Sequence, residues 1–348
     1  MFYFIIFFFL FAFSFAFIDK KINSIWGVAI ALLLIFIAGG RYMCGADYGS
    51  YENMFNEISW QNFYFVEPLF GILIALVKYI GGFNLFLLFI AALSVSLKFW
   101  VINKYSPYPL FSYAILFVGL YVSLDMGQIR QGLGLSICWF SIQYLEKRPF
   151  VFFFLILLGI GVHFSAFVFA GIYFLRNINF SVKKAFLGIF FCFCIGKIMS
   201  LLVHIVMIDN PLLQFKIDTY VDNEDYGKAI GFNVGMLIKL VLLYILLIYK
   251  KRIIAEQQTA NILINAYILG NFVYFFLLFN EIIAGRFSLY FIYFDIILVP
   301  IISKYIISQN SRTLFISLYF LFLFYQLYVR LYLTNGTDLI PYHNFLIG

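Results

Sequence analysis

Apolar runs dominate this chain, many of them about 17 to 25 residues long, and short polar stretches separate them. A helix needs about 20 apolar residues to cross the hydrocarbon core of a membrane, which is about 30 Å thick. Outer-membrane barrels instead show segments of about ten residues with alternating hydropathy. The sequence therefore predicts an all-α, polytopic membrane bundle.

The composition supports the same conclusion, because 64% of the residues are hydrophobic and only 11% are charged. A soluble domain carries about 25% charged residues. These values exclude a cytosolic enzyme, a disordered protein and a secreted disulfide scaffold.

The net charge of +7 comes from basic residues in short loops, such as Lys147-Arg148 and 250–252. The positive-inside rule accounts for this pattern, so we expect no nucleic-acid partner. The cysteines have no spacing typical of a zinc site or a disulfide framework. We expect neither a metal nor a cofactor.

The charge pattern also predicts the topology of the first half. The run 2–18 enters from outside, Lys20 and Lys21 mark a cytoplasmic turn, and 25–40 crosses back. The acidic stretch 41–67 should then be an ordered external loop. With 209–231 as a second periplasmic loop, residues 1–348 are expected to form a single transmembrane domain.

Two runs do not fit simple spans. The run 69–80 is short, and counting it as a full span would put Lys98 and Lys104 outside, so we expect it to be re-entrant or interfacial. The run 150–175 is too long for one untilted span, and its glycines predict two half-helices meeting near His163. About ten to twelve membrane segments are expected, without an internal repeat.

The first candidate site is residues 40–51, where Arg41 and Asp47 can face one cavity beside the sugar-stacking rings of Tyr48 and Tyr51. The alternative is a loop packed by its aromatic residues, with ordinary solvated charges.

The second candidate is residues 125–132, which precede an apolar helix. Arg130 in the first helical turn opposes the helix macrodipole, and that placement favours a bound anion such as a phosphate or diphosphate. The alternative is that Arg130 snorkels or pairs with Asp125.

Two further candidates follow. His163 lies beside Gly159 and Gly161, and a histidine at a helix break can move a proton, although a lone membrane histidine is more often a packing residue. Ser165 would orient it or contact substrate. Glu281 and Arg286 read most simply as an exposed turn with a weak ion pair. Lys98 and Lys239 are interpreted as snorkelling, lipid-facing residues.

The order of these motifs resembles the EpsG-like branch of the Wzy-type bacterial polysaccharide polymerases. The resemblance covers roughly residues 39–175. It rests on four short motifs in order: Arg41 with Gly45-Ala46-Asp47-Tyr48-Gly49-Ser50-Tyr51, then Glu67-Pro68-Leu69-Phe70, Ile129-Arg130-Gln131, and His163-Phe164-Ser165-Ala166.

The resemblance implies an inner-membrane glycosyltransferase whose active site faces the periplasm. It would transfer a growing O-antigen or capsule glycan from undecaprenyl diphosphate to the non-reducing end of the next lipid-linked repeat unit. Membrane lipids, a chain-length regulator and a flippase are the expected partners.

The resemblance also implies roles for individual residues, which would bind the leaving group, the acceptor or the sugars. Arginines hold the diphosphate, and His163 or Asp47 activates the acceptor hydroxyl. The residues expected to bind the diphosphate are Arg130, Arg286 and Arg41; those expected to bind and orient the rest of the substrate are Tyr48, Glu67, Gln131, Ser165 and Glu281.

Three other functions remain open at this point. A polyprenyl-phosphate-sugar glycosyltransferase would add a single sugar and often uses a divalent metal. A transporter or flippase for lipid-linked glycans would suit broken helices, although the charges collect near one face. A membrane-bound acyltransferase, which can also use a membrane histidine, ranks last.

Overall fold

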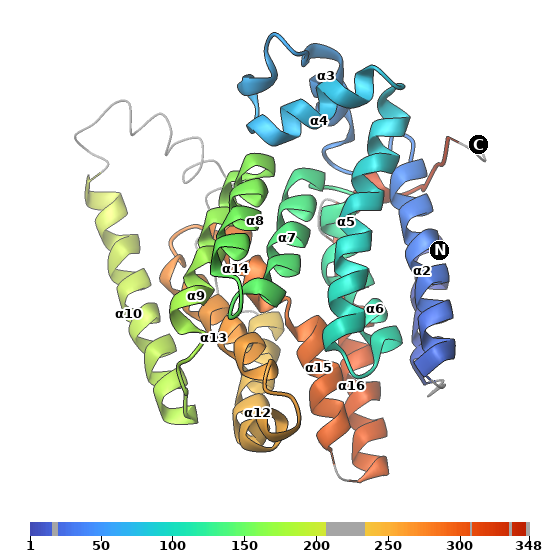
Figure 1. Cartoon of the computed structure of the whole chain (residues 1–348). Helices are drawn as coiled ribbons and strands as arrows, with labels where there is room; N and C mark the ends of the chain where they lie inside the picture. Colours follow the sequence, from blue (N-terminus) through green and yellow to red (C-terminus); the bar gives the residue numbers. More distant parts are fainter. Residues whose placement is uncertain (16–19, 207–233, 307, 334–335, 346–348) are drawn as a thin grey trace. The chain divides into compact units, whose positions relative to one another are not determined.

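The computed structural model describes residues 1–348 except 16–19, 207–233, 307, 334–335 and 346–348. The described residues are helical almost throughout and contain no strand; one isolated antiparallel bridge joins Arg41 to Asn344. The predicted all-α membrane bundle is confirmed (Figure 1). The predicted external loop 209–231 lies outside the described residues.

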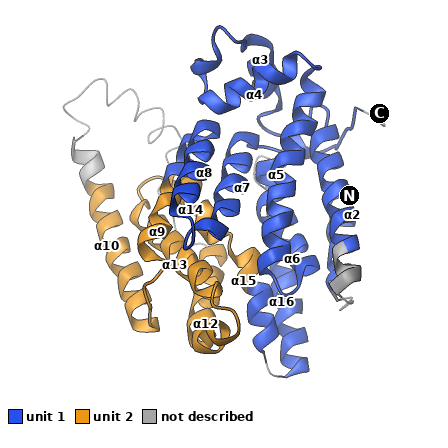
Figure 2. Ribbon diagram, viewed as in Figure 1, with its two compact units in different colours: residues 1–167, 299–348 blue, residues 168–298 orange. Residues whose placement is uncertain are grey.

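The described chain divides into two compact units, residues 1–167 with 299–348, and residues 168–298 (Figure 2). We call them unit 1 and unit 2. The expectation of one transmembrane domain stays a prediction.

Unit 1 holds most of the candidate residues. Its helices are α1 (Phe2–Phe15), α2 (Lys20–Gly40), α3 (Tyr48–Glu57), α4 (Pro68–Lys78), α5 (Phe83–Tyr105), α6 (Pro109–Leu116), α7 (Ile129–Ser141), α8 (Pro149–Val162) and α16 (Gln309–Tyr328). Short 3₁₀ and π segments join them: η1 (Phe63–Phe65), η2 (Phe117–Asp125), η3 (Ile142–Tyr144), η7 (Val329–Leu333) and η8 (Gly336–Leu339).

Unit 2 contains α9 (Ile172–Leu175), α10 (Val182–Val206), α12 (Val234–Glu256), α13 (Ala260–Phe276) and α14 (Glu281–Ile292). Two elements cross the boundary between the units, η4 (Phe164–Gly171) and α15 (Asp295–Tyr305).

Three described helices are long and apolar enough to span a membrane: α5, Val182–Leu201 of α10, and Gln309–Leu333. The pair α14 and α15, bent by 45°, would make a fourth span. Seven further apolar helices are shorter, with 10–17 residues each. The expected total of ten to twelve membrane segments stays a prediction.

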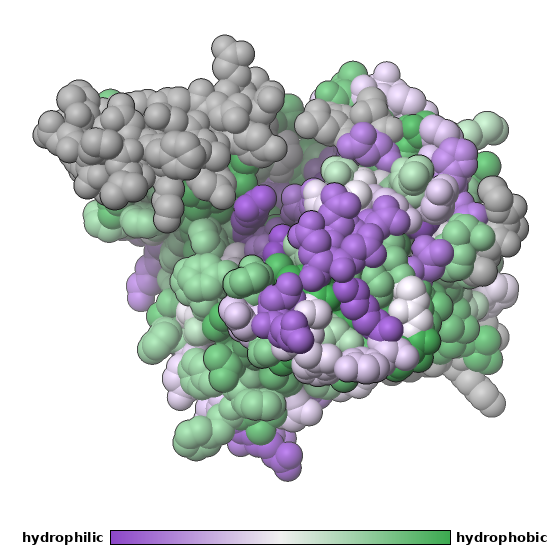
Figure 3. All heavy atoms as spheres, turned by 90° about the horizontal axis from the view of Figure 1, so that it is seen from above, coloured by the Kyte–Doolittle hydropathy of each residue, from purple (hydrophilic) through white to green (hydrophobic). Residues whose placement is uncertain are grey.

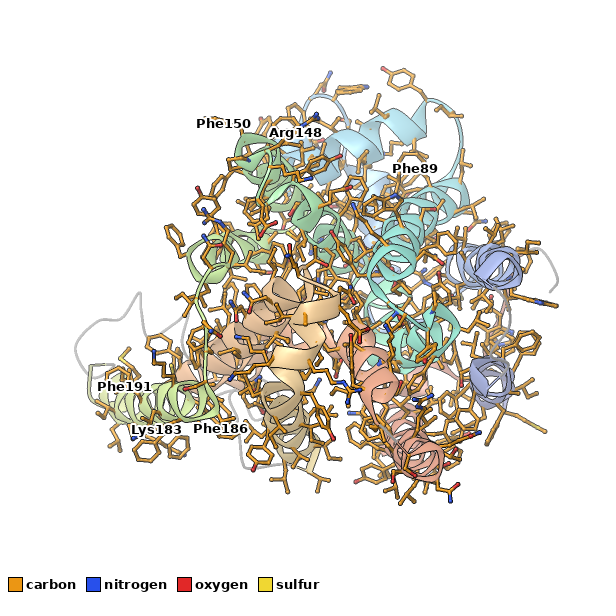
Figure 4. The ribbon with its side chains drawn as sticks, turned by 60° about the horizontal axis from the view of Figure 1, so that its bottom comes forward. Phe89, Arg148, Phe150, Lys183, Phe186 and Phe191 are labelled. Atoms are coloured by element: carbon orange, nitrogen blue, oxygen red, sulfur yellow. The ribbon has the colours of Figure 1, made fainter. Side chains whose placement is uncertain are left out.

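Exposed aromatic side chains show which surfaces suit lipid. Phe191 on α10 is 65% exposed, and Phe150 at the start of α8 is 90% exposed. Figure 4 shows both rings on the outside of their helices. Exposing large apolar side chains to water costs free energy, whereas lipid chains are a favourable environment for them.

The structure describes both irregular runs. α8 ends at Val162, and His163 has an extended backbone (φ −155°, ψ 121°) before η4 begins. The predicted helix break at His163 is therefore confirmed. α4 has 11 residues and, at about 1.5 Å per residue, is too short to cross a membrane. Its length supports a re-entrant or interfacial segment.

The stretch 41–67 is ordered and contains a helix that the sequence reasoning did not place. One face of α3 buries Tyr51 and Phe55 against Phe70 of α4 and Phe86 of α5. Lys78 donates to the carbonyl of Ile58 just beyond the end of α3, at 2.6 Å. The opposite face of α3 is polar, and Figure 3 shows hydrophilic residues gathered on this side of unit 1.

The interpretation of Lys98 as a lipid-facing residue is wrong. Its side chain is fully buried, and its Nζ lies 2.7 and 2.8 Å from the two carboxylate oxygens of Asp125. Ser94 also donates to this carboxylate, at 2.6 Å, and bonds to Ser136 at 3.0 Å. A buried lysine is tolerated here because its charge is paired and hydrogen-bonded.

Lys239 departs from expectation in the same way. In unit 2 it forms an ion pair with Asp295, with Nζ and Oδ2 3.0 Å apart, and both side chains are largely buried. Each lysine is far from its carboxylate partner in the sequence and contacts it only in the folded chain. The hydropathy of the neighbouring residues therefore does not distinguish a buried, paired lysine from a snorkelling one.

Candidate active site

Arg130 lies in the first turn of α7 and pairs with Glu67. The Nη1 of Arg130 is 2.7 Å from Oε2 of Glu67, and the two side chains are 29% and 22% exposed. Glu67 is the residue before Pro68, which begins α4. The alternative pairing of Arg130 with Asp125 is excluded, because Asp125 binds Lys98. An ion pair therefore joins the starts of α4 and α7.

Tyr51 of α3 lies against the same guanidinium group. The Arg130 guanidinium carbon is 5.8 Å from the centre of the Tyr51 ring, and the two side chains are hydrogen-bonded. Burial raises the pKa of the Tyr51 phenol, so the phenol is neutral at pH 7 and keeps its proton. The Nε of Arg130 is buried and has no hydrogen-bond partner among the described residues.

A second arginine, Arg41, directly follows α2. Its side chain is buried, and its charge acts on the phenols of Tyr51 and Tyr48. Its Nη1 donates to the carbonyls of Ala38 and, at 3.3 Å, of Asp125. Its Nε and Nη2 have no hydrogen-bond partner in the part of the chain that the structure describes. A buried guanidinium with two unfilled donors suits an anion or an ordered water.

The loop after Arg41 packs closely on the turn before α7. Met43 and Gly45 both have positive φ values, 46° and 107°. A Cβ at Gly45 would lie 2.2 Å from the carbonyl oxygen of Met126. This close approach fixes the path of the chain to Asp47, which occupies the N-cap position of α3 and acts electrostatically on Tyr51.

We expect Gly45→Ala to destabilise the protein by about 1–3 kcal/mol, because the new methyl group meets backbone in a conformation that favours glycine. Gly49→Ala is the matched control, since nothing lies within 4 Å of a Cβ there. Thermal unfolding of the detergent-solubilised protein tests this, and equal melting temperatures for the two variants would contradict it.

His163 and Ser165 form a second polar group in unit 1. The Nδ1 of His163 lies 2.7 Å from Oγ of Ser165, which is buried. The Nε2 of Gln131 reaches the same hydroxyl at 3.4 Å. Because Gln131 follows Arg130 in α7, this hydrogen bond joins the first turn of α7 to the segment just after the helix break at His163.

The end of α8 also touches the start of α4. A Cβ at Gly161 would lie 3.0 Å from the Cβ of Leu69, two residues after Glu67. The starts of α4 and α7, the end of α8 and the loop 41–47 therefore meet in unit 1. Figure 1 shows α3 and α4 above the upper tips of α7 and α8.

The aromatic rings predicted to stack on sugars are buried. Tyr48 packs against Phe83 with the ring centroids 5.3 Å apart, and Tyr51 packs against Phe70 at 6.2 Å. Their rings hold the loop and α3 in place, as the alternative interpretation of 40–51 expected. The same interpretation expected solvated charges, and for Arg41 this is wrong because its side chain is buried.

Glu281 and Arg286 lie in the first turns of α14, in unit 2, and both are exposed. Asn280 caps this helix by accepting from the backbone N–H of Ile283 at 2.9 Å. The expectation that Arg286 joins Arg130 at one site stays a prediction.

Sequence reasoning missed the supporting role of Asp125. Its side chain holds Lys98 and its carbonyl accepts from Arg41, so the buried ion pair anchors one of the arginines. The available signal was the opposite charge of Lys98 and Asp125, both within apolar surroundings.

Within the described residues, no group of three or more His, Cys, Asp or Glu side chains is placed to hold a metal ion. The arrangement offers two guanidinium groups for an anion, with an imidazole and carboxylates as proton acceptors. Such a set suits the transfer of a group away from an anionic leaving group.

Comparison with known proteins gives two matches. The EpsG family profile matches residues 24–344. The amylovoran biosynthesis protein AmsC of Erwinia amylovora is 31% identical over 123 residues, which cover 32% of this chain and 33% of that protein. The matched part thus spans about a third of the length of this relative. No solved structure matches the chain.

Proposed function

Because the chain belongs to the EpsG family, we propose that it is a membrane glycosyltransferase that polymerises a polysaccharide from lipid-linked repeat units. The similarity to a protein of amylovoran biosynthesis supports a role in polysaccharide biosynthesis. The donor is a growing glycan on undecaprenyl diphosphate, and the acceptor is the non-reducing end of the next lipid-linked unit.

In the proposed reaction, an acceptor hydroxyl oxygen attacks the anomeric carbon of the donor glycan. The bond from that carbon to the diphosphate oxygen breaks, and undecaprenyl diphosphate leaves with the electron pair. A base on the enzyme accepts the hydroxyl proton. The site therefore needs cations for the leaving group and a proton acceptor near the incoming hydroxyl.

The observation that carries this proposal is the Arg130–Glu67 pair beside Tyr51. A guanidinium at a helix N-terminus faces the positive end of the macrodipole, and the Glu67 carboxylate balances it while no substrate is bound. A diphosphate oxygen would accept a hydrogen bond from the Nε of Arg130, which has no partner among the described residues. Arg41, which is buried and acts electrostatically on Tyr51, has two further donor atoms without a partner among the described residues.

Two residues can act as the base. The Nδ1 of His163 bonds to Ser165, which fixes the imidazole ring next to the α8 break. Asp47 is partly exposed, and its side chain makes no capping hydrogen bond to α3. An imidazole and a carboxylate are both able to serve as a general base toward a sugar hydroxyl.

Asp47→Asn and His163→Gln distinguish the two bases. We expect the substitution that removes the base to lower kcat by about 100-fold or more, and the other to lower it less than tenfold. Rates of glycan lengthening at saturating donor and acceptor measure this. If both variants keep more than a tenth of the wild-type kcat, neither residue is the base.

We further propose that this enzyme lies in the bacterial inner membrane with the site facing the periplasm. The acidic balance of 41–67 and the basic loops elsewhere support this orientation. A flippase would deliver its lipid-linked substrates, and a chain-length regulator would act on its product.

The test uses the purified protein in vesicles that contain an undecaprenyl-diphosphate-linked repeat unit. A ladder of lengthened glycans, with release of undecaprenyl diphosphate, is the expected result. Products one sugar longer, formed only with a divalent cation, would identify a polyprenyl-phosphate-sugar transferase instead. Movement of labelled lipid across the vesicle without lengthening would identify a transporter. Either outcome would overturn the polymerase proposal.

A further inference from the structure

A C-terminal segment pairs with the loop that carries Arg41 and Asp47. We call residues 336–345 the C-terminal strap. The N–H of Tyr42 donates to the carbonyl of His343, and the N–H of Phe345 donates to that of Gly40, both at 2.9 Å. Arg41 and Asn344 thus face each other in an antiparallel bridge, with a hydrogen bond on either side. Figure 1 shows this part of the chain, in red, beside α2.

The strap holds the loop at a second place. The N–H of Gly45 donates to the carbonyl of Asp338 at 2.8 Å. The thiol of Cys44 lies 3.5 Å from the carbonyl oxygen of Leu339. The strap therefore satisfies backbone groups just before the positive-φ turn at Met43 and Gly45 and at Gly45 itself.

Two strap side chains complete the contact. Asn344 is 3% exposed, and its Nδ2 lies 2.8 Å from the Tyr342 hydroxyl, which donates to the carbonyl of Ile37 at 2.9 Å. A Cβ at Gly40 would lie 2.5 Å from the Asn344 Nδ2, so a larger residue at 40 would displace the amide. Tyr342 also stacks on Phe2, with ring centroids 4.3 Å apart.

These contacts bear on the position of Arg41 more than on the hydrophobic core. The strap binds the backbone at Gly40 and Tyr42, the two neighbours of Arg41. The guanidinium is held separately, by the carbonyls of Ala38 and Asp125. Without the strap, the loop would lose the backbone hydrogen bonds at Gly40, Tyr42 and Gly45. A misplacement of about 1 Å in an active site can cost about 100-fold in rate.

We propose that the C-terminal strap, through Asn344 and Tyr342, is a positioning element of the active site that fixes the Arg41 and Asp47 loop for the reacting substrate. This inference rests on the proposed function. Asn344 is a positioning residue, because it acts on the substrate through the loop.

The test compares variants in a Cys44→Ala background, which also serves as the reference. We expect Asn344→Ala to lower kcat/KM for glycan lengthening by about tenfold to 100-fold, with little change in melting temperature. His343→Ala is the matched control, because His343 is exposed and its carbonyl, which the substitution keeps, makes the bond to Tyr42.

A disulfide separates positioning from general stability. Tyr42 and His343 flank the bridge and are joined by the backbone hydrogen bond from the Tyr42 N–H to the His343 carbonyl, and an engineered disulfide between them is designed to hold this contact covalently. Tyr42→Cys with His343→Cys, added to Asn344→Ala, should restore kcat/KM when oxidised and lose it again when reduced. Oxidation of the same pair with Asn344 intact should leave the activity unchanged.

Three activity results would overturn the inference. They are full activity of Asn344→Ala, failure of the oxidised disulfide to rescue it, and inactivation of the chain by the disulfide when Asn344 is intact. The last would mean that the strap must open.

Hydrogen exchange of residues 40–47 provides a readout that does not depend on polymerisation. We expect Asn344→Ala to speed exchange at the Tyr42 and Gly45 amides. Unchanged exchange would refute the inference even if the protein has another activity, whereas a reference chain that lengthens no glycan refutes the proposed function alone.

Discussion

Arg130→Ala should lower the rate of glycan lengthening by about 100-fold to 1,000-fold, the loss typical when a preorganised donor to a developing anion is removed. The variant also leaves the Glu67 carboxylate without its ion-pair partner. Rates measured with purified protein and the lipid-linked unit test this. Arg148→Ala is the matched control, because Arg148 is an exposed arginine of unit 1 that lies before α8 (Figure 4).

Arg130→Lys extends the same test to geometry. Lysine keeps the charge but has no planar fork, and it cannot bond Glu67 and Tyr51 in the way that the guanidinium does. We expect it to recover less than a tenth of the lost activity. If Arg130→Ala polymerises at the wild-type rate, the assignment of the leaving-group site is wrong.

Lys98→Met should cost about 3–5 kcal/mol of stability, because it leaves the Asp125 carboxylate buried without its cation. We expect most of the protein to be lost from the membrane fraction. Lys98→Met with Asp125→Leu removes both charges and should recover much of the folded protein. The yield of monodisperse protein and its melting temperature measure the effect.

Lys104→Met is the control for this pair, since it makes the same change in the same helix at an exposed position. The double variant keeps the hydrogen bond to Arg41, because the Asp125 carbonyl that accepts it belongs to the backbone. Equal yields of Lys98→Met and Lys104→Met would show that the buried pair contributes little to stability.

The sequence predicted those features that depend on neighbouring residues. The helix break at His163 was predicted from Gly159 and Gly161 within an overlong apolar run. The short apolar run 69–80 predicted a helix too short to cross a membrane. Arg130 was recognised because its place in the first helical turn is unfavourable by local rules alone.

Features that depend on distant residues were missed or misread. Glu67 and Arg130 are 63 residues apart, and nothing in either motif chooses Glu67 over the nearer Asp125. Lys98 has the hydropathy environment of a snorkelling residue, and only its partner 27 residues away shows otherwise. The strap could not be predicted, because backbone pairing between 41 and 344 leaves no pattern in side chains.

The bridge between Arg41 and Asn344 also constrains how the protein is made. An emerging polypeptide has its second helix long before the ribosome reaches position 344, yet the turn at 43–45 lacks its pairing until then. The loop that carries Arg41 can therefore take up its paired conformation only after residue 344 has been synthesised, later than every described α-helix of the chain.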